Sequence, residues 1–269
     1  MVFDLEIYKK TWGELQQRKI ITPYKNNREA ITLEVFDRLD STNNKAWELI
    51  DRNNKILLSA IALSQTAGKG QWGRSWVSAE GGLYLSVAMN LELELKHSFA
   101  LIMATAWGIT TVLRVYDLPV TIKWSNDLIL NNCKLGGIKV ETRNTGNKID
   151  KAVIGVGINW CNSTPSPGIN LQSYYQNKDD KSIKSLEVLT AIASYGIVYG
   201  YEHYLAIGID RLLAEYTAIL NSIGKQINLN RNFGEVIGVT TAGKLQVKMR
   251  SPGASTIINF APGEVSLGY

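Results

Sequence analysis

A glycine-rich segment at residues 68–74 has the composition of a loop that binds an anion. Its sequence is G-K-G-Q-W-G-R, which fits the pattern G-x-G-x-x-G. Glycines leave backbone N–H groups free to approach phosphate oxygens, and Lys69 and Arg74 add positive charge. Trp72 and the nearby Trp76 offer flat faces on which a ring can pack. The segment predicts a site for an anionic ligand, with a flexible surface loop as the alternative.

The residues after this loop and the motifs of the whole chain argue against three better-known phosphate-binding patterns. A dinucleotide-binding fingerprint needs a helix directly after the glycines, whereas here Gly81, Gly82 and a predicted strand follow. The chain contains no G-x-x-x-x-G-K-[ST] motif, which excludes a P-loop. It contains neither H-R-D nor D-F-G, which excludes a protein kinase.

Three shorter segments combine polar groups or glycines with turns and strands. Residues 123–128, K-W-S-N-D-L, place Lys123 at the end of an apolar strand and Asp127 in the turn behind it. A lysine there can hold two anions together, and a carboxylate can meet Mg²⁺ through its oxygens. The glycines of 134–138 and 155–159 lie in predicted strands, where glycine often marks the close approach of a ligand. A plain hairpin turn and tight strand packing are the respective alternatives.

Hydropathy patterns predict the elements that position these segments. Strands are predicted over residues 31–39, 56–63, 83–91, 120–124, 128–130, 134–141 and 152–159. Helices are predicted after the N-cap candidates of 40–43 and over 99–116, 186–207 and 210–223. Short strands at 226–229, 233–240, 244–249 and 256–260 predict a small barrel. We expect an α+β protein with an N-terminal extension at 1–30, a main domain at 31–223 and a β-rich domain at 224–269.

Composition narrows the class further. The 269 residues are 45% apolar and 20% charged, which is typical of a soluble globular protein. The net charge of +5 favours an anionic partner without naming it. The two cysteines and two histidines are scattered along the chain, and nothing near either cysteine resembles C-x-x-C, so a structural zinc site and a disulfide framework are both disfavoured. The apolar stretches 98–113 and 188–201 fall short of the ~18 residues of a membrane span, and no signal peptide is visible, so we expect a cytoplasmic protein.

Together, in this order and spacing, the segments resemble the biotin protein ligase family. The resemblance rests on Asp40–Asn43, the glycine loop ending in G-R-S-W, the 123–128 turn, and residues 134–138 and 155–159. The segment 263–267, G-E-V-S-L, also resembles that family's C-terminal domain. The resemblance implies a mixed sheet with helices, related to class II aminoacyl-tRNA synthetases, as a catalytic biotin/ATP-binding domain. An SH3-like barrel is implied for the C-terminal domain.

The resemblance also implies a two-step reaction and a set of site residues. Biotin and Mg·ATP give biotinyl-5′-AMP and pyrophosphate, and biotin then passes to a lysine of the biotin carboxyl carrier protein of acetyl-CoA carboxylase. Lys123 takes the catalytic role of holding the two anionic reactants. The implied biotin site is Ser41, Thr42, Asn43, Gln65, Lys69, Gly70, Gln71, Lys123, Gly137, Gly155 and Gly157. The implied ATP site is Lys69, Arg74, Trp76, Asn126, Lys134 and Asn159, with Asp127 as the Mg²⁺ ligand and no tightly held organic cofactor.

The chain departs from the family pattern at two positions of the glycine loop. Lys69 and Gln71 stand where the family often has arginine, so we expect the adenylate to be held less tightly. We also expect the glycine loop to be mobile without ligand, because ordering glycines is entropically costly. Some members carry an N-terminal DNA-binding domain, but only 39 residues precede Asp40 here. We expect a ligase alone, with neither DNA nor a membrane as partner.

Two other functions compete with this interpretation. A lipoate-protein ligase shares the fold and the adenylation chemistry, but the paired tryptophans of the glycine loop and the barrel favour biotin. A nucleic-acid-binding module would suit a basic chain that ends in a small β domain. Residues 224–269 carry only five basic against two acidic residues, and three aromatic residues give a thin stacking platform.

Overall fold

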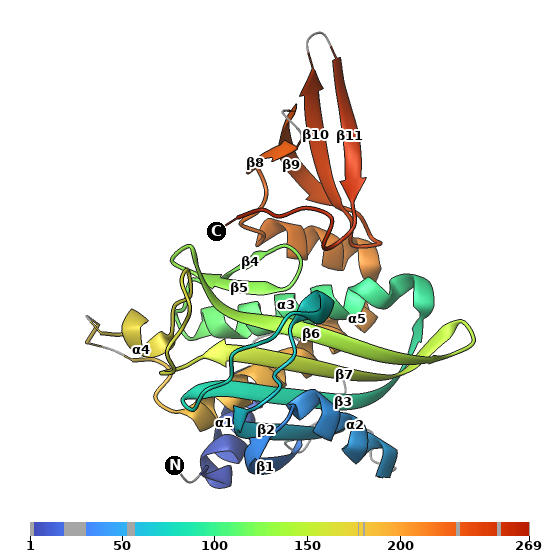
Figure 1. The fold of residues 1–269 in the computed structure, drawn as a ribbon. Helices are drawn as coiled ribbons and strands as arrows, with labels where there is room; N and C mark the ends of the chain where they lie inside the picture. The colour runs from blue at the N-terminus through green and yellow to red at the C-terminus, as the bar shows by residue number, and fades with distance from the viewer. Residues whose placement is uncertain are drawn as a thin grey trace.

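The computed structural model describes residues 3–18, 31–52, 57–176, 178–179, 181–229, 232–251 and 254–268. Within them a mixed seven-stranded sheet forms the body of the protein (Figure 1). Its strand order is β1 (Thr32–Leu39), β2 (Leu57–Gln65), β3 (Gly82–Glu94), β7 (Lys148–Asn159), β6 (Cys133–Thr145), β5 (Asp127–Leu130) and β4 (Thr121–Lys123). β1 and β2 run parallel, and the other neighbours are antiparallel.

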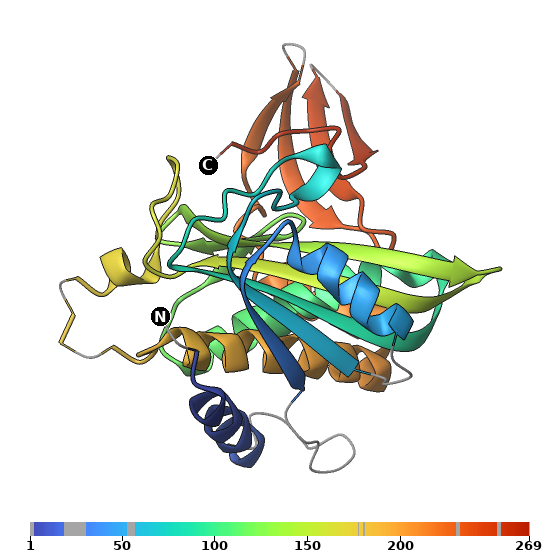
Figure 2. The same cartoon turned by 60° about the horizontal axis from the view of Figure 1, so that its bottom comes forward.

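Alternating side chains give the sheet two different faces. Leu85 and Val87 of β3 point into the main core beneath α3 (Ser98–Val115) and α5 (Leu186–Ala218), whereas Ala88 packs on the other side under α2 (Thr42–Arg52). Figure 2 shows α2 and the two long helices on opposite faces. α3 and α5 touch backbone to backbone, since a methyl group on Gly108 would collide with the backbone of α5.

Most predicted elements of the main domain form close to their predicted bounds. The predicted helices 186–207 and 210–223 are the two halves of α5, which breaks at Gly208 with a φ of 77°. The second half ends at Ala218, before the predicted end. Residues 95–115 form a helical segment long and apolar enough to cross a membrane. However, 67% of its apolar 18-residue stretch is buried inside the protein, as in a core helix.

The N-terminal extension contains a helix that the sequence analysis did not predict. In α1 (Leu5–Gln17), Asp4 caps the first turn, and its carboxylate accepts hydrogen bonds from two backbone N–H groups. Tyr8, Trp12 and Leu15 are spaced to lie on one face, and all three are buried against the main core. The short helix α4 (Leu171–Tyr174) was also missed. Residues 19–30 lie outside the described part of the chain.

A second sheet stands at one end of the first. Its order is β11 (Ala254–Phe260), β10 (Leu245–Ser251), β9 (Asn232–Val239) and β8 (Gln226–Leu229), all antiparallel. This small sheet is consistent with the SH3-like domain that the resemblance implied. The chain that leaves β11 turns back over the glycine loop of the main domain (Figure 2).

Candidate active site

A pocket of about 480 Å³ lies between the main sheet, the glycine loop and the segment after β11. Volumes in this range suit small-molecule substrates. Five cationic side chains and two carboxylates line it, so the pocket favours anions. Every site residue that the resemblance implied lies in this lining except Asn159.

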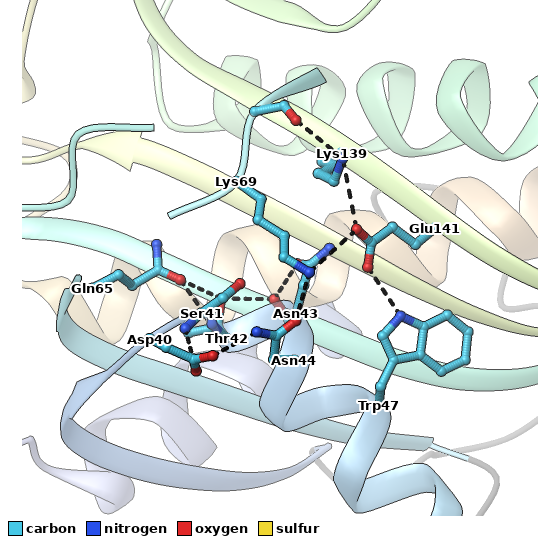
Figure 3. A network of polar contacts seen from close by, with 12 residues as sticks. Asp40, Ser41, Thr42, Asn43, Asn44, Trp47, Gln65, Lys69, Lys139 and Glu141 are labelled. Carbon is cyan, nitrogen blue, oxygen red and sulfur yellow. Dashed lines mark hydrogen bonds and ion pairs between the residues drawn. The ribbon is translucent and has the colours of Figure 1, made fainter. Parts of the chain in front are cut away.

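One end of the pocket is a polar cluster at the start of α2. Gln65 Oε1 accepts hydrogen bonds from the backbone N of Thr42 at 2.7 Å and from its hydroxyl at 3.1 Å (Figure 3). Asn43 Oδ1 accepts a hydrogen bond from Ser86 Oγ at 2.7 Å. Asn43 Nδ2 is buried and has no protein partner in the described part of the chain. A buried donor of this kind is normally satisfied, so it offers a hydrogen bond to a ligand.

Lys123, at the end of β4, is the buried cation of the pocket. Only 8% of the residue is exposed. Burial lowers the pKa of its ammonium group from 10.5 to about 8, and Asp127 partly opposes this shift. Lys134, Arg74 and Lys225 lower it further by repulsion. The ammonium remains mostly charged at neutral pH, where a bound anion would relieve its poor solvation.

The turn that follows Lys123 is fixed by contacts from three directions. The backbone N of Trp124 donates to Ser222 Oγ at 3.0 Å, and its Nε1 donates to the backbone O of Gly243 at 3.1 Å. Asn126 Nδ2 donates to the backbone O of Ile138 at 2.8 Å. Asn126 therefore uses its amide to hold the turn against β6, although the resemblance implied ATP binding for it.

Asp127 is paired with a lysine across the pocket wall. Lys134 Nζ lies 2.7 Å from Asp127 Oδ1 and 5.3 Å from the centroid of the Trp76 ring. Trp76 Nε1 is a second buried donor without a protein partner among the described residues. Mg²⁺ commonly binds one or two carboxylates together with substrate phosphates. Asp127 fits such a ligand, and Lys134 would then be released toward the phosphates.

The strand glycines line the pocket, and two of them also make room for side chains. A methyl group on Gly157 would lie 2.5 Å from Trp76 Nε1, and one on Gly155 would collide with the Asn43 amide. These glycines make room for the two side chains that carry unpaired donors. Gly137 is more open, since its nearest neighbours would lie at 3.5 Å.

Asn159 lies outside the pocket. It is 7% exposed, and its Nδ2 donates to the backbone O of Ile169 at 3.2 Å. Its Oδ1 accepts a hydrogen bond from Asn162 Nδ2 at 3.0 Å. These contacts hold the loop after β7, so Asn159 has a structural role beside the site.

Several pocket residues were not singled out from the sequence. Residues 262–268 form one wall, and Trp72 of the glycine loop packs close to Gly263 within it. Lys139 also lines the pocket, and its Nζ donates to the backbone O of Gly70 at 3.0 Å. The resemblance of residues 263–267 to the family's C-terminal domain was a signal for this segment. Nothing in the linear sequence shows that the segment returns to the pocket of the main sheet.

Part of the chain is similar in sequence to known proteins. Residues 35–159 match the Biotin/lipoate A/B protein ligase family. The chain is 27% identical over 245 residues to the bifunctional ligase/repressor BirA of Salmonella typhimurium, covering 87% of this chain and 77% of that protein. It is 29% identical over 169 residues to the biotin–[acetyl-CoA-carboxylase] ligase of Paracoccus denitrificans, covering 58% of this chain and 68% of that protein.

The fold is also similar to that of a solved structure. The structure of the biotin protein ligase from Aquifex aeolicus in complex with biotin and ATP has a TM-score of 0.66 at 22% identity, covering 87% of this chain and 97% of that one. The family match covers a little less than half of the chain, and the Aquifex aeolicus structure has a similar overall fold. These similarities to BirA and to biotin protein ligases confirm the resemblance predicted from the motifs.

Proposed function

We propose that the chain is a cytoplasmic biotin–protein ligase that activates biotin with Mg·ATP and transfers it to a carrier-protein lysine. The observation that carries this proposal is the position of buried Lys123 in one pocket with the unpaired Asn43 donor and the cationic loop. The named relatives support the choice of biotin, and the Aquifex aeolicus protein was solved with biotin and ATP.

In the first step a carboxylate oxygen of biotin forms a bond to the α-phosphorus of ATP. The bond from that phosphorus to its bridging oxygen breaks, and pyrophosphate leaves. Both reactants are anionic, so Lys123 brings them together and stabilises the charge that develops on the phosphoryl oxygens. A magnesium ion beside Asp127 would neutralise phosphate charge during this step.

In the second step the amine of a biotin carboxyl carrier lysine attacks the acyl carbon of the adenylate. The bond between the acyl carbon and the phosphate oxygen breaks, AMP leaves, and the amine loses its proton to solvent. The glycine loop and residues 262–268 cover the pocket and would keep water from the mixed anhydride until the carrier arrives.

The test is pyrophosphate release from the purified protein with Mg·ATP, comparing biotin with lipoate. We expect release with biotin, followed by labelling of a single lysine when a carrier domain is added. Release with lipoate alone would move the protein to the lipoate ligases. No release with either acid would reject the adenylation chemistry itself.

A further inference from the structure

Glu141, in the middle of β6, connects three parts of the protein that meet beside the pocket. Its Oε1 lies 3.9 Å from Lys69 Nζ on the glycine loop and 3.6 Å from Lys139 Nζ on β6. Its Oε2 accepts a hydrogen bond from Trp47 Nε1 of α2 at 3.0 Å. Figure 3 shows Glu141 between Lys69, Lys139 and Trp47. Its side chain is 24% exposed, so the carboxylate is only partly solvated.

Both lysines beside Glu141 are attached to the glycine loop. Lys69 belongs to the loop and donates to Asn44 Oδ1 of α2 at 2.5 Å. Lys139 donates to the loop backbone at Gly70 O, at 3.0 Å. Glu141 therefore neutralises Lys69, which belongs to the loop, and Lys139, which binds the loop backbone from the sheet.

We propose that Glu141 is a positioning residue that latches the glycine-rich loop over the pocket when no ligand is bound, and so opposes the mobility that the loop's glycines favour. Without the carboxylate, Lys69 and Lys139 would repel each other at the point where the loop meets β6. With it, the loop, β6 and α2 share one charge cluster. The latch is a property of the ligand-free chain, so it is independent of the proposed function.

The latch also gives the loop a way to respond to an anion. Lys69 and Lys139 line the pocket, so an anionic ligand competes with Glu141 for the same two ammonium groups. A ligand that attracts them takes over the loop contacts, and the loop stays closed around it. For the proposed ligase, this means that Glu141 sets how quickly the pocket opens to release an activated intermediate, a consequence that rests on the proposed function.

The experiment is hydrogen exchange of a peptide spanning residues 66–77 in the ligand-free protein, comparing the wild type with Glu141→Gln. This peptide contains the backbone hydrogen bonds of the loop, such as Trp76 N to Gly68 O at 2.8 Å. Glutamine keeps the acceptor for Trp47 but removes the charge. We expect exchange in the loop to rise about fivefold, which corresponds to about 1 kcal/mol of closing free energy.

Asp51→Asn is the matched control. Asp51 also joins α2 to the sheet and also faces two cations, Arg143 Nη1 at 2.7 Å and Lys151 Nζ at 3.2 Å, but it touches no loop residue that is described. Loop exchange in this variant should equal the wild-type value. Unchanged exchange in Glu141→Gln, or an equal rise in both variants, would overturn the latch.

The salt dependence of loop exchange is a second measurement, and packing alone would not change it. Screening weakens partly exposed ion pairs, so loop exchange in the wild type should rise between low salt and about 0.5 M salt. In Glu141→Gln the same salt series should lower loop exchange or leave it unchanged, because salt screens the remaining repulsion between Lys69 and Lys139. Wild-type exchange that is independent of salt would contradict the proposal, whether or not the protein proves to be a ligase.

Discussion

Lys123 carries a positive charge into a part of the site where only 8% of the residue is exposed. Such a charge is costly in the empty protein and useful once anions are bound, because the poorly solvated ammonium interacts strongly with them. Asn43 and Trp76 follow the same principle with buried donors that no described protein atom satisfies. At the scale of the residue, this site is prepared for a polar, anionic ligand.

Replacing Lys123 with methionine tests its catalytic role. We expect biotin-dependent pyrophosphate release to fall by about 10²–10³-fold, because one preorganised stabiliser of phosphoryl charge is removed. The rate is measured at saturating biotin and Mg·ATP. A loss below about tenfold would place the main charge stabilisation on another group, such as Lys134 or Arg74.

The same variant makes a prediction about stability and pH. The pKa of Lys123 is about 8 in the folded chain instead of 10.5, so below pH 8 folding carries the cost of burying the charge. That cost disappears as the pH rises from about 8 to 10.5, since the unfolded chain then binds more protons than the folded one. Lys123→Met should be more stable at pH 7 by up to about 3 kcal/mol, and this gain should vanish near pH 10. Urea unfolding of both proteins at the two pH values measures it.

Gln71 tests how firmly the loop holds the activated intermediate. Its Nε2 donates to the backbone O of Ile138 at 3.2 Å, so the side chain already lies at the pocket wall. An arginine there would add a charge-assisted hydrogen bond to a phosphate. We expect Gln71→Arg to slow release of biotinyl-5′-AMP several-fold and Gln71→Glu to speed it. An arginine variant that releases the intermediate no more slowly would reject the idea.

At the scale of elements, the site depends on how closely the glycine loop approaches the sheet. β6 and β7 pair through Gly137 and Gly157 in register, which leaves a flat strip on which the Trp76 indole lies. The turn from β4 to β5 presents Lys123 and Asp127 on paired strand ends. A rigid sheet thus carries the charges, while a loop carries the cover.

Gly157→Ala tests this close approach. The added methyl group would lie 2.5 Å from Trp76 Nε1 and 2.6 Å from Cε2, so the indole must move. We expect a loss of about 1–3 kcal/mol in unfolding free energy and weaker nucleotide binding. Gly13→Ala is the control, because a methyl group there meets nothing within 4 Å and should leave stability unchanged or raise it. Equal effects in the two variants would dismiss the packing argument.

At the scale of the whole molecule, the pocket is shared between the main sheet with its loops and the segment that follows the second sheet. Trp124 of the main domain donates a hydrogen bond to Gly243 beside the second sheet, and residues 262–268 close one wall. Trp72 meets that wall at Gly263. The segment after β11 is therefore part of the candidate site.

Removing residues 262–269 tests this arrangement. The variant ends after Ala261, and we expect it to keep its secondary structure, measured by circular dichroism, because β11 ends at Phe260. One wall of the pocket is lost, so the KM for ATP should rise about tenfold or more, equivalent to about 1.4 kcal/mol of binding. An unchanged KM would show that this segment covers the pocket without contributing to binding.

The sequence by itself determined the strands of the main sheet, the long helices and the group of polar and glycine motifs. Apolar periodicity, caps and turn residues are local signals, and the family motifs are contiguous in the chain. It did not predict α1, because Tyr8, Trp12 and Leu15 form only a weak apolar stripe in a polar segment. The helix is stabilised by packing against α5, which the local sequence does not show.

Only the tertiary structure decided which groups share the pocket and what each one touches. It placed Asn159 outside the pocket, packed Asn43 and Trp76 against Gly155 and Gly157, and added Lys139 and residues 262–268 to the lining. It also joined Lys69 to Glu141, residues that lie far apart in the chain. Such pairings depend on strand order and register across the sheet, which bring distant residues together in ways that no short-range pattern encodes.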